Sequence, residues 1–532
     1  MLARAPARSS TVSLANPSKS LRNSRNYAVL NPQRIAPEKI GLIQRVRRDK
    51  IKATIKIPQD ENTELLAFPY ERLGDDYHVN WTLCRHGIVP TKEAYRNLHL
   101  QGLLNRIRQD KVDNKKKVVY RNSVADEPLS QYLQVAGKDL NNEQFGKFQT
   151  EFRRHLSESD VYMRDAAIGS HLVAETETRV VSDNPTTDYF LRNMMTGLPI
   201  SAAPHFKHSL FVTAVSSIAN SKLDDAVKSK RAVIAYSREK AQLLIGGNTT
   251  TKELRTALAF AVADRYLSQP ALNILPLNCD SVVDANGNST LIFNSNELFL
   301  SQLGQGLKLP GKLFGAHNHL WSLSGGLVRA WDGASFPCAA PVEKGSLIET
   351  LPNNVTRTTQ SLHPTANVAN HPTNIVFMIN DTQGVLPTIG KLNSAEAAQF
   401  LFGGYNGSKF EPMYSNALKQ VFHNINFEET ASLFKKLIEE NKTSVFLVNV
   451  AEKPGKLHKS DAIEKLFSSI MDGSAAKASS GGDFKILKAI TSLPGFKTSE
   501  VNTTATGKFE EELISFVNTN FPKPPKPPAP TQ

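Results

Sequence analysis

The sequence predicts a mixed α/β (α+β) fold, because strand-like runs and amphipathic helical stretches follow one another along the chain. The strand-like runs are short and rich in β-branched or aromatic residues, and they lie at 232–236, 242–245, 289–293, 375–379 and 445–450. No segment repeats at a fixed period, which argues against a solenoid or a propeller. With 532 residues, of which 40% are hydrophobic and 21% charged, the chain is long enough for about two to four domains.

Three helices are predicted from apolar residues at helical spacing. The first covers 139–156, where three phenylalanines share one face and an asparagine can cap the N-terminus; these residues are Phe145, Phe148, Phe152, Asn141 and Asn142. The other two helices cover 428–440 and 461–471. Their expected N-caps are Asn426 for the one and Ser460 or Asp461 for the other.

Basic residues are concentrated at the N-terminus. The first fifty residues hold eleven Lys or Arg against two acidic residues, although the whole chain carries a formal net charge of only +13. Residues 1–35 lack Asp and Glu and are rich in Ser, Ala and Arg, which is typical of an organelle targeting segment. They predict a mitochondrial protein, in the matrix or on the matrix-facing side of the inner membrane. A basic arm that contacts RNA or another protein is the alternative.

The composition disfavours a membrane-spanning protein and a protein stabilised by disulfides or structural zinc. No apolar run approaches the ~18–20 residues of a membrane-spanning helix, so no transmembrane segment is predicted. Cys84, Cys279 and Cys338 lie far apart and without CxxC spacing, so neither a disulfide framework nor a structural zinc site is expected.

Short stretches spread in order over residues 126–500 carry a family resemblance. Residues 375–387, IVFMINDTQGVLP, resemble the strand and Gly-Val-Leu-Pro loop of ATP-type phosphoenolpyruvate carboxykinases. Residues 244–247, LIGG, and 493–495, LPG, are similar to further motifs of that family at similar spacing. The resemblance implies a two-lobed fold with an N-terminal extension. The expected segments are 1–35 for targeting, 36–125 for the extension, 126–270 for the N-terminal lobe, 271–515 for the mononucleotide-binding lobe and 516–532 for a Pro-rich tail.

The nucleotide loop that the resemblance implies is altered in this sequence. The family's loop ends in Gly-Lys-Thr-Thr, because glycines let backbone N–H groups approach phosphates and the lysine neutralises them. The strand at 289–293 leads here into Asn294, Ser295, Asn296 and Glu297, without glycine, lysine or threonine. We therefore expect no nucleotide-binding site.

The implied metal ligands are also replaced. Arg255 stands at the ligand lysine and Asn278 at the ligand histidine, while Ala316 and His317 stand at the paired aspartates. An arginine effectively never loses its proton, and an amide is a weaker transition-metal ligand than an imidazole. No metal and no other cofactor is therefore expected. His317 and His319 could form a replacement site, but ordinary loop histidines are the favoured interpretation.

The implied substrate arginines survive only in part. Val112 stands at the first of them, beside a basic run, Lys115, Lys116 and Lys117, that we interpret as a solvated or partner-facing loop. Arg179 and Arg357 fall near two others. They predict either a vestigial anion site or structural salt bridges, and the second is favoured.

The sequence as a whole predicts a degenerate carboxykinase, or pseudoenzyme. Its expected role is that of a structural or accessory subunit of a large mitochondrial assembly, either the mitochondrial ribosome or a respiratory-chain or ATP synthase complex. Other subunits are then the expected partners, together with ribosomal RNA at the basic arm and at Lys115–Lys117. The alternatives are a ligand-binding regulatory protein and a divergent, active phosphoenolpyruvate carboxykinase.

Overall fold

The fold is described from a computed structural model. It describes residues 83–107, 117–171, 174–198, 206, 209–218, 230–294, 311–337, 345–362, 367–381, 383–410, 412–413, 427–453, 456–481, 487–490 and 503–521. Several predictions therefore lie outside the described residues: the targeting segment 1–35, Val112, Lys115, Lys116, Ser295, Asn296, Glu297, Asn426 and the tail from 522 onward.

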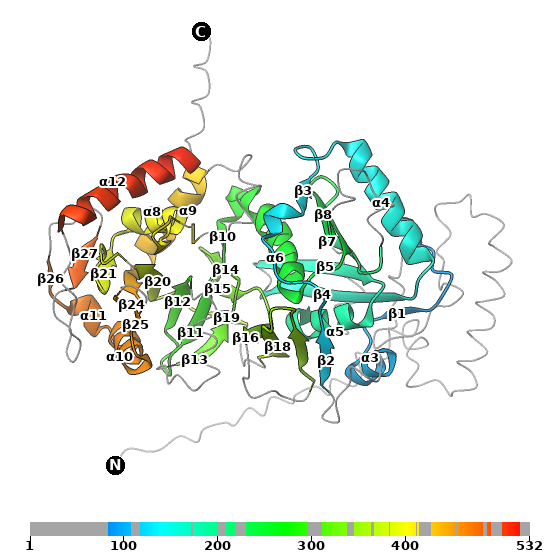
Figure 1. Ribbon diagram of the computed structural model, residues 1–532, viewed down its shortest axis with the longest axis horizontal. Coiled ribbons are helices and arrows are strands. Elements are labelled where there is room, and N and C mark those ends of the chain that lie inside the picture. The colour runs from blue at the N-terminus through cyan, green and yellow to red at the C-terminus, as the bar shows by residue number, and fades with distance from the viewer. Residues whose placement is uncertain are drawn as a thin grey trace, which may run out of the picture.

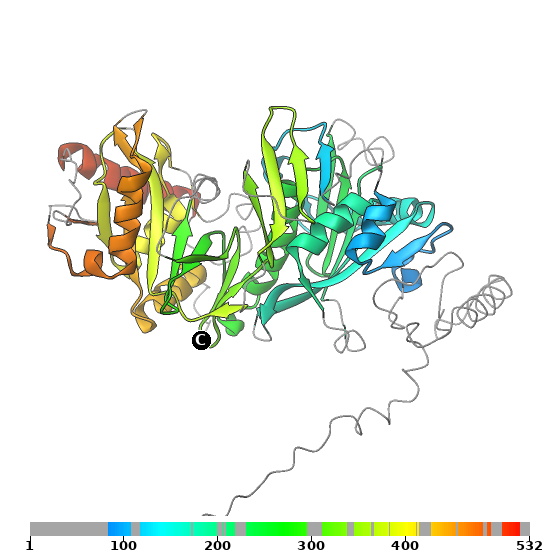
Figure 2. The same cartoon turned by 90° about the horizontal axis from the view of Figure 1, so that it is seen from below.

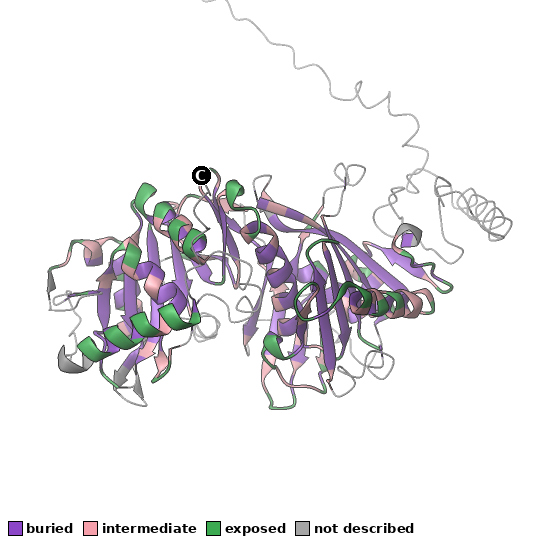
Figure 3. Cartoon of the chain, turned by 90° about the horizontal axis from the view of Figure 1, so that it is seen from above, coloured by how far each residue is buried: buried purple, intermediate pink, exposed green. Residues whose placement is uncertain are grey.

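Two lobes, each built on a large mixed sheet, lie side by side (Figure 1). This is the two-lobed, mixed α/β fold that the sequence predicts. Strands of both lobes are almost wholly buried, and exposed residues gather on the outer faces of the helices that cover them (Figure 3).

The first lobe contains an eight-stranded sheet in the order β1-β4-β5-β7-β9-β8-β3, with β6 paired to β4. Its strands are β1 (Ala94–Arg96), β3 (Leu133–Val135), β4 (Val161–His171), β5 (Ala174–Ser182), β6 (Thr196–Gly197), β7 (Leu210–Val215), β8 (Ala232–Ser237) and β9 (Gln242–Gly247). β5, β7 and β9 are adjacent and parallel, so their carboxyl ends meet at one edge of the sheet.

Helices cover both faces of this sheet. They are α3 (Leu100–Arg106), α4 (Asn142–Ser157), α5 (Pro185–Met194) and α6 (Thr251–Leu267), with short 3-10 turns at Leu83–His86, Leu129–Gln131 and Pro270–Leu272. β7 shows why both faces are covered, because alternate residues of a strand point to opposite sides. Phe211 and Val215 join the cluster under α4, while Val212 and Ala214 join the cluster under α5 and α6.

The second lobe contains a nine-stranded sheet in the order β13-β11-β12-β20-β23-β21-β27-β26, with β22 paired to β20. Its strands are β11 (Asp280–Val283), β12 (Ser289–Phe293), β13 (Lys312–Gly315), β20 (Asn374–Asp381), β21 (Ile389–Leu392), β22 (Asn406–Gly407), β23 (Ser444–Asn449), β26 (Ser480–Gly481) and β27 (Lys488–Ile490). Its helices are α8 (Ser394–Gly403), α9 (Phe427–Glu440), α10 (Ser460–Met471), α11 (Ser474–Lys477) and α12 (Thr503–Asn520). α8, α9 and α12 lie on one side of the sheet and α10 on the other (Figure 2).

Three smaller sheets complete the described chain. The first contains β10 (Ile274–Leu277), β14 (His319–Ser322), β15 (Gly326–Arg329) and β19 (Val368–Ala369). The second contains β16 (Gly333–Pro337), β18 (Thr356–Ser361), β17 (Leu347–Thr350) and β2 (Val118–Arg121). The third pairs β24 (Ala451–Lys453) with β25 (Lys456–Leu457). β2 pairs with β17 in parallel, and α5 packs on β16, β17 and β18. The strands β16, β17 and β18, which fall in the segment predicted as the second lobe, therefore pack on the first.

The N-terminal extension is integrated where it is described. β1 pairs in parallel with β4, and β2 forms the edge of the sheet that holds β16–β18. Leu103 and Leu104 of α3 are buried in the main core. The described part of 36–125 thus belongs physically to the first lobe.

The predicted elements agree closely with the observed ones. All five strand-like runs are strands, β8, β9, β12, β20 and β23, and the three helices are α4, α9 and α10. Asn141 caps α4 in a reciprocal box, in which its side chain accepts from the Gln144 N–H and the Gln144 side chain accepts from the Asn141 N–H. The prediction of Ser460 or Asp461 as the cap of α10 is wrong. Both residues are already helical, and Lys459 occupies the cap position without a side-chain hydrogen bond.

None of the described helices combines the length and apolar character needed to span a bilayer.

Candidate functional site

The candidate site lies against α6, at the junction of the first lobe with the β10–β14 sheet. α6 begins in a capping box, because Thr250 Oγ1 accepts from the Glu253 N–H (3.2 Å) and Glu253 Oε2 accepts from the Thr250 N–H (2.9 Å). This fixes the first turn, so that Lys252, Arg255 and Thr256 all face the same cavity.

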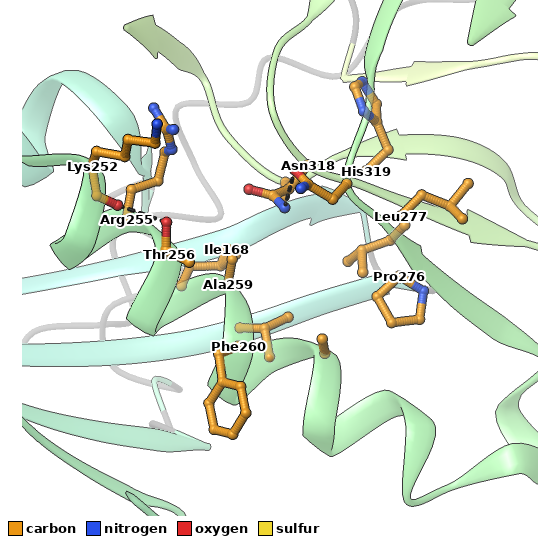
Figure 4. A pocket seen from close by; sticks show the side chains of 15 residues that line it. Ile168, Lys252, Arg255, Thr256, Ala259, Phe260, Pro276, Leu277, Asn318 and His319 are labelled. Atoms are coloured by element: carbon orange, nitrogen blue, oxygen red, sulfur yellow. Dashed lines mark hydrogen bonds between the residues drawn. The ribbon is translucent and has the colours of Figure 1, made fainter. Parts of the chain in front are cut away.

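The cavity has a volume of about 130 Å³ and is mixed in character (Figure 4). Its apolar wall includes Ile168, Phe260 and Leu320, and its polar groups include Lys252, Arg255, Asn278, Asn318 and His319. No Asp or Glu lines it. The cavity thus brings together two cations and two amides without a carboxylate.

The cavity gathers only some of the predicted site positions. Arg255 is buried and Asn278 is exposed, and the Asn278 side chain accepts a long hydrogen bond from Asn318 (3.4 Å). Ala316 instead lies in a small apolar cluster with Ala334 and Phe336. Within the described residues, no group of three or more His, Cys, Asp or Glu is arranged to hold a metal ion.

His317 is held by backbone contacts beside the cavity. It has a left-handed φ of +74°, and its own N–H donates to Asp280 Oδ1 (2.7 Å). Its Nε2 accepts from the Ser335 N–H (3.2 Å). Burial, followed by the positive charges of Arg255 and Lys252, holds the pKa of His317 well below its usual value. The ring is therefore neutral and already bonded, as an ordinary loop histidine would be.

His319 is wholly buried in a polar contact of its own. Its Nδ1 lies 3.0 Å from the Cys279 carbonyl oxygen and its Nε2 lies 2.6 Å from Ser281 Oγ. The carbonyl can only accept, so Nδ1 carries the proton and Nε2 accepts from the serine hydroxyl. Burial lowers the pKa of His319 to about 3. The prediction of a loop histidine is wrong for His319, because this buried residue is the first of strand β14. Both of its ring nitrogens are bonded within the fold, although it also lines the cavity.

Arg179 forms a buried ion pair. Its Nε and Nη2 donate to the two carboxylate oxygens of Asp165 at 2.7 and 2.8 Å. Arg96 donates to Asp165 Oδ2 from Nε (3.0 Å) and Nη2 (2.6 Å), so one carboxylate lies between two guanidinium groups. Burial alone would raise the pKa of Asp165, but the charges and hydrogen bonds of Arg179 and Arg96 outweigh it and lower that pKa.

Arg357 is paired with carboxylates in the same way. Its Nη1 donates to Asp126 Oδ1 (2.9 Å), its Nη2 donates to Asp126 Oδ2, and Glu349 Oε2 lies 3.9 Å from Nη1. Thr250 Oγ1 also donates to Asp126 (2.8 Å), which connects the pair to the start of α6. Arg179 and Arg357 thus have the contacts of structural salt bridges, the favoured interpretation.

Glu349 is a buried carboxylate that no pattern in the sequence singles out. It accepts from Tyr120 Oη (2.9 Å), from Asn122 Nδ2 (2.9 Å) and from both the N–H and the hydroxyl of Thr251. Neither Asp126 nor Asp165 is among the site residues that the sequence predicts. Each bonds to residues far away in sequence, which no local pattern reveals.

The family model described as phosphoenolpyruvate carboxykinase matches residues 111–296 and 354–480, which is more than half of the chain. The chain belongs to the phosphoenolpyruvate carboxykinase family.

Similar curated proteins are bacterial enzymes named phosphoenolpyruvate carboxykinase (ATP). One from Campylobacter lari is 24% identical over 398 residues, which cover 66% of this chain and 75% of the relative. One from Bradyrhizobium sp. is 22% identical over 458 residues, covering 75% and 84%. One from Afipia carboxidovorans is 23% identical over 465 residues, covering 77% and 84%.

The carboxykinase family match is interrupted over residues 297–353. This interval contains Ala316 and His317. Asn294, the described residue that follows β12, has a left-handed φ of +54°, and its side chain donates to the Met378 carbonyl (3.1 Å). The amide thus bonds to the neighbouring strand β20.

The residues at the cavity do not fit the divalent metal that a carboxykinase uses. Divalent metal ions are held by carboxylate, imidazole or other neutral and anionic donors, whereas Lys252 and Arg255 present positive charge. Both ring nitrogens of His319 and the Nε2 of His317 are engaged in hydrogen bonds, and Asn278 offers a single amide. We therefore derive no step of chemistry through a bound metal.

Proposed function

We propose that this carboxykinase-family protein is non-catalytic and serves as a structural or accessory subunit of a large mitochondrial assembly. The observation that carries the proposal is the composition of the cavity on α6. Arg255, Asn278 and Ala316 occupy the positions that resemble the family's metal site, and no Asp or Glu lines the cavity. Transfer of a phosphoryl group depends on metal ions and cationic clamps that neutralise phosphate charge, so the absence of a metal-binding set removes its main support.

The state of the arginines supports the same proposal. A substrate carboxylate that approached Arg357 would have to displace Asp126, which holds the guanidinium by two hydrogen bonds. Arg179 is similarly bonded to Asp165 at both of its carboxylate oxygens. Breaking such pairs leaves a buried charge uncompensated, which costs several kcal/mol, on the order of 3–5. These side chains are therefore better suited to stability than to binding.

The assembly part of the proposal rests on composition. The acid-poor, basic N-terminus is typical of a mitochondrial targeting segment, and an extension precedes the family match. Candidate hosts are the mitochondrial ribosome and a respiratory-chain or ATP synthase complex, with ribosomal RNA as a candidate contact of the basic segments.

The proposal that the protein is non-catalytic is tested by a turnover assay. Purified protein is incubated with oxaloacetate, ATP and Mn²⁺, with a bacterial carboxykinase as the positive control. We expect no product above the blank. Turnover that disappears in Asp126→Ala or Arg357→Gln would favour the alternative of a divergent, active carboxykinase and refute the proposal.

The assembly part is tested by sedimentation of mitochondrial extract at low salt. We expect the protein to migrate with a large particle and to co-purify with that particle's subunits or RNA. Release by salt would indicate contacts made by its basic segments. Migration as a free monomer at every salt concentration would contradict the proposal.

The cavity itself favours a second candidate, a ligand-binding regulatory protein. Lys252 and Arg255 beside an apolar wall provide groups for a small carboxylate or phosphate. Thermal unfolding with ATP, oxaloacetate or Mn²⁺ separates this candidate from the first, because a ligand that binds only the folded state raises its unfolding temperature. A rise with ATP or oxaloacetate alone would favour it.

A further inference from the structure

A second cavity lies on another face of α6, at the carboxyl ends of β5, β7 and β9. The three strands are parallel and adjacent, with Ser182 opposite Ala214 and Val215 opposite Gly246. The chain leaves them at Asn184, Ser216 and Asn248, and all three residues line the cavity. In open α/β sheets, ligands bind at the carboxyl ends of parallel strands.

This cavity has a volume of about 210 Å³ and a polar lining. Its walls consist mainly of hydroxyl and amide side chains, with one cation, Arg121, and no acidic residue. Thr251 and Leu254 face it from α6, whereas Lys252 and Arg255 face the first cavity. The two cavities are therefore lined by different residues, and we call the second one the threonine cavity.

Part of the lining is fixed by its own hydrogen bonds. Asn184 Nδ2 donates to Ser216 Oγ (3.2 Å), and Asn248 Nδ2 donates to Ser123 Oγ (2.5 Å). The first N–H groups of the adjoining helices are also bonded, that of Thr186 to Asn184 and that of Thr251 to Glu349. The helix ends are thus already capped, and side chains are what the cavity offers to a ligand.

Another part of the lining has bonding capacity to spare. Within the described chain, the hydroxyls of Thr186, Thr187 and Thr249 make no hydrogen bond, and Arg121 is exposed without an ion pair. A threonine hydroxyl can both donate and accept, and a guanidinium binds a phosphate through two parallel hydrogen bonds.

We propose that the threonine cavity binds a small phosphate monoester that also carries hydroxyl groups. Arg121 holds the phosphate, and the threonine hydroxyls bond to the hydroxyls of the ligand. An apolar ligand would leave these hydroxyls desolvated and unpaired, which is unfavourable. A divalent cation would find no carboxylate in the lining and would be repelled by Arg121. Because apolar ligands and divalent cations are both disfavoured, an anionic ligand with hydroxyl groups is the class that fits this lining.

The test uses the full chain and isothermal titration calorimetry with glycerol 3-phosphate, inorganic phosphate and glycerol as probes. We expect glycerol 3-phosphate to bind most tightly, phosphate more weakly and glycerol weakest. Arg121→Gln should weaken binding of glycerol 3-phosphate at least about tenfold, and Thr187→Val should weaken it less while leaving phosphate binding unchanged. No heat with glycerol 3-phosphate at millimolar concentration would overturn the proposal.

Arg265→Gln is the matched control, because Arg265 is a basic residue in the last turn of the same helix and outside both cavities. It should bind glycerol 3-phosphate like the unaltered chain. Equal weakening in Arg121→Gln and Arg265→Gln would show that only overall charge matters, and would overturn the assignment to this cavity. Circular dichroism of each variant verifies folding, and Thr187→Val retains the test if Arg121→Gln does not fold.

Discussion

The guanidinium of Arg357 donates to both carboxylate oxygens of Asp126, which lies 231 residues earlier in the chain. Asp126 also accepts from Thr250, the N-cap of α6, so one carboxylate connects β18 with the helix that lines both cavities. This pairing gives Arg357 a structural partner within its own chain.

Removal of the Asp126 carboxylate should destabilise the fold. Asp126→Asn removes the carboxylate charge that is hydrogen-bonded to the buried Arg357 guanidinium, and we expect a loss of about 2 kcal/mol in the free energy of unfolding. Urea denaturation measures it. Glu143→Gln is the control, because its pair with Lys147 is exposed and contributes less than about 1 kcal/mol. Equal effects of the two variants would contradict the assignment.

Removal of the Asp165 carboxylate should destabilise the fold still more. Asp165→Asn removes the charge of the carboxylate that lies between the buried guanidinium groups of Arg96 and Arg179, so we expect a loss of about 3–5 kcal/mol. The measurement is again the urea midpoint, with Glu151→Gln as the control for a partly exposed arginine pair. A loss below about 1 kcal/mol would show that the two guanidinium groups find other partners.

Stability should fall between pH 7 and pH 5 because of the two neutral histidines. The pKa of His319 is about 3 and that of His317 is also well below its usual value, whereas both rise to about 6.5 on unfolding. The unfolded chain therefore takes up protons first, and stability is present above about pH 6.5 and lost as the pH falls toward the folded-state pKa. Each histidine contributes a slope of up to about 1.4 kcal/mol per pH unit.

Urea unfolding at pH 7, 6 and 5 measures this slope, and His317→Gln should reduce it by about half. The carboxyl groups with lowered pKa, such as Asp165, lose their contribution only below about pH 4, outside this window. Stability that does not change from pH 7 to pH 5 would contradict the neutral, buried state of both rings.

Added Mn²⁺ should leave the unfolding temperature unchanged. The cavity on α6 presents Lys252, Arg255 and Asn278 and no carboxylate, so we expect this cavity to gain no stability from the metal. Differential scanning fluorimetry with Mn²⁺ and then with EDTA measures the effect. A rise with Mn²⁺ that EDTA reverses and that Asn278→Ala abolishes would show a metal site at this cavity.

Local features of the fold could be read from the sequence, and long-range ones could not. Asn141 with Gln144, and the phenylalanine stripe of α4, specify a helix and its start within a few residues of chain. The strands β8, β9 and β20 are similarly evident from their apolar runs. The predicted cap of α10 was wrong because the helix begins at Ser460 itself, and helix ends commonly differ by one or two residues from the best capping residue.

The same difference between local and long-range features applies to the residues of the candidate site. The replaced positions, Arg255 and Asn278, could be named from motif spacing, and both line the cavity. That Asp126 bonds to Arg357 and that Asp165 lies between Arg96 and Arg179 depends on strand pairing across many residues. The threonine cavity needs the carboxyl ends of three strands to meet, which no single segment of sequence shows.

The pairing of β2 with β17 limits where this chain can be cut into fragments that fold independently. The chain passes from the first lobe to the second after α6, returns with β16–β18 to pack on α5, and then passes to the second lobe again at β20. A single cut near residue 270 would leave β16–β18 on one fragment and their edge strand β2 on the other. The large sheet of each lobe would stay whole, but the four-stranded sheet would be divided, and β16–β18 would be separated from both β2 and α5. We therefore expect the two halves to be soluble only when they are produced together.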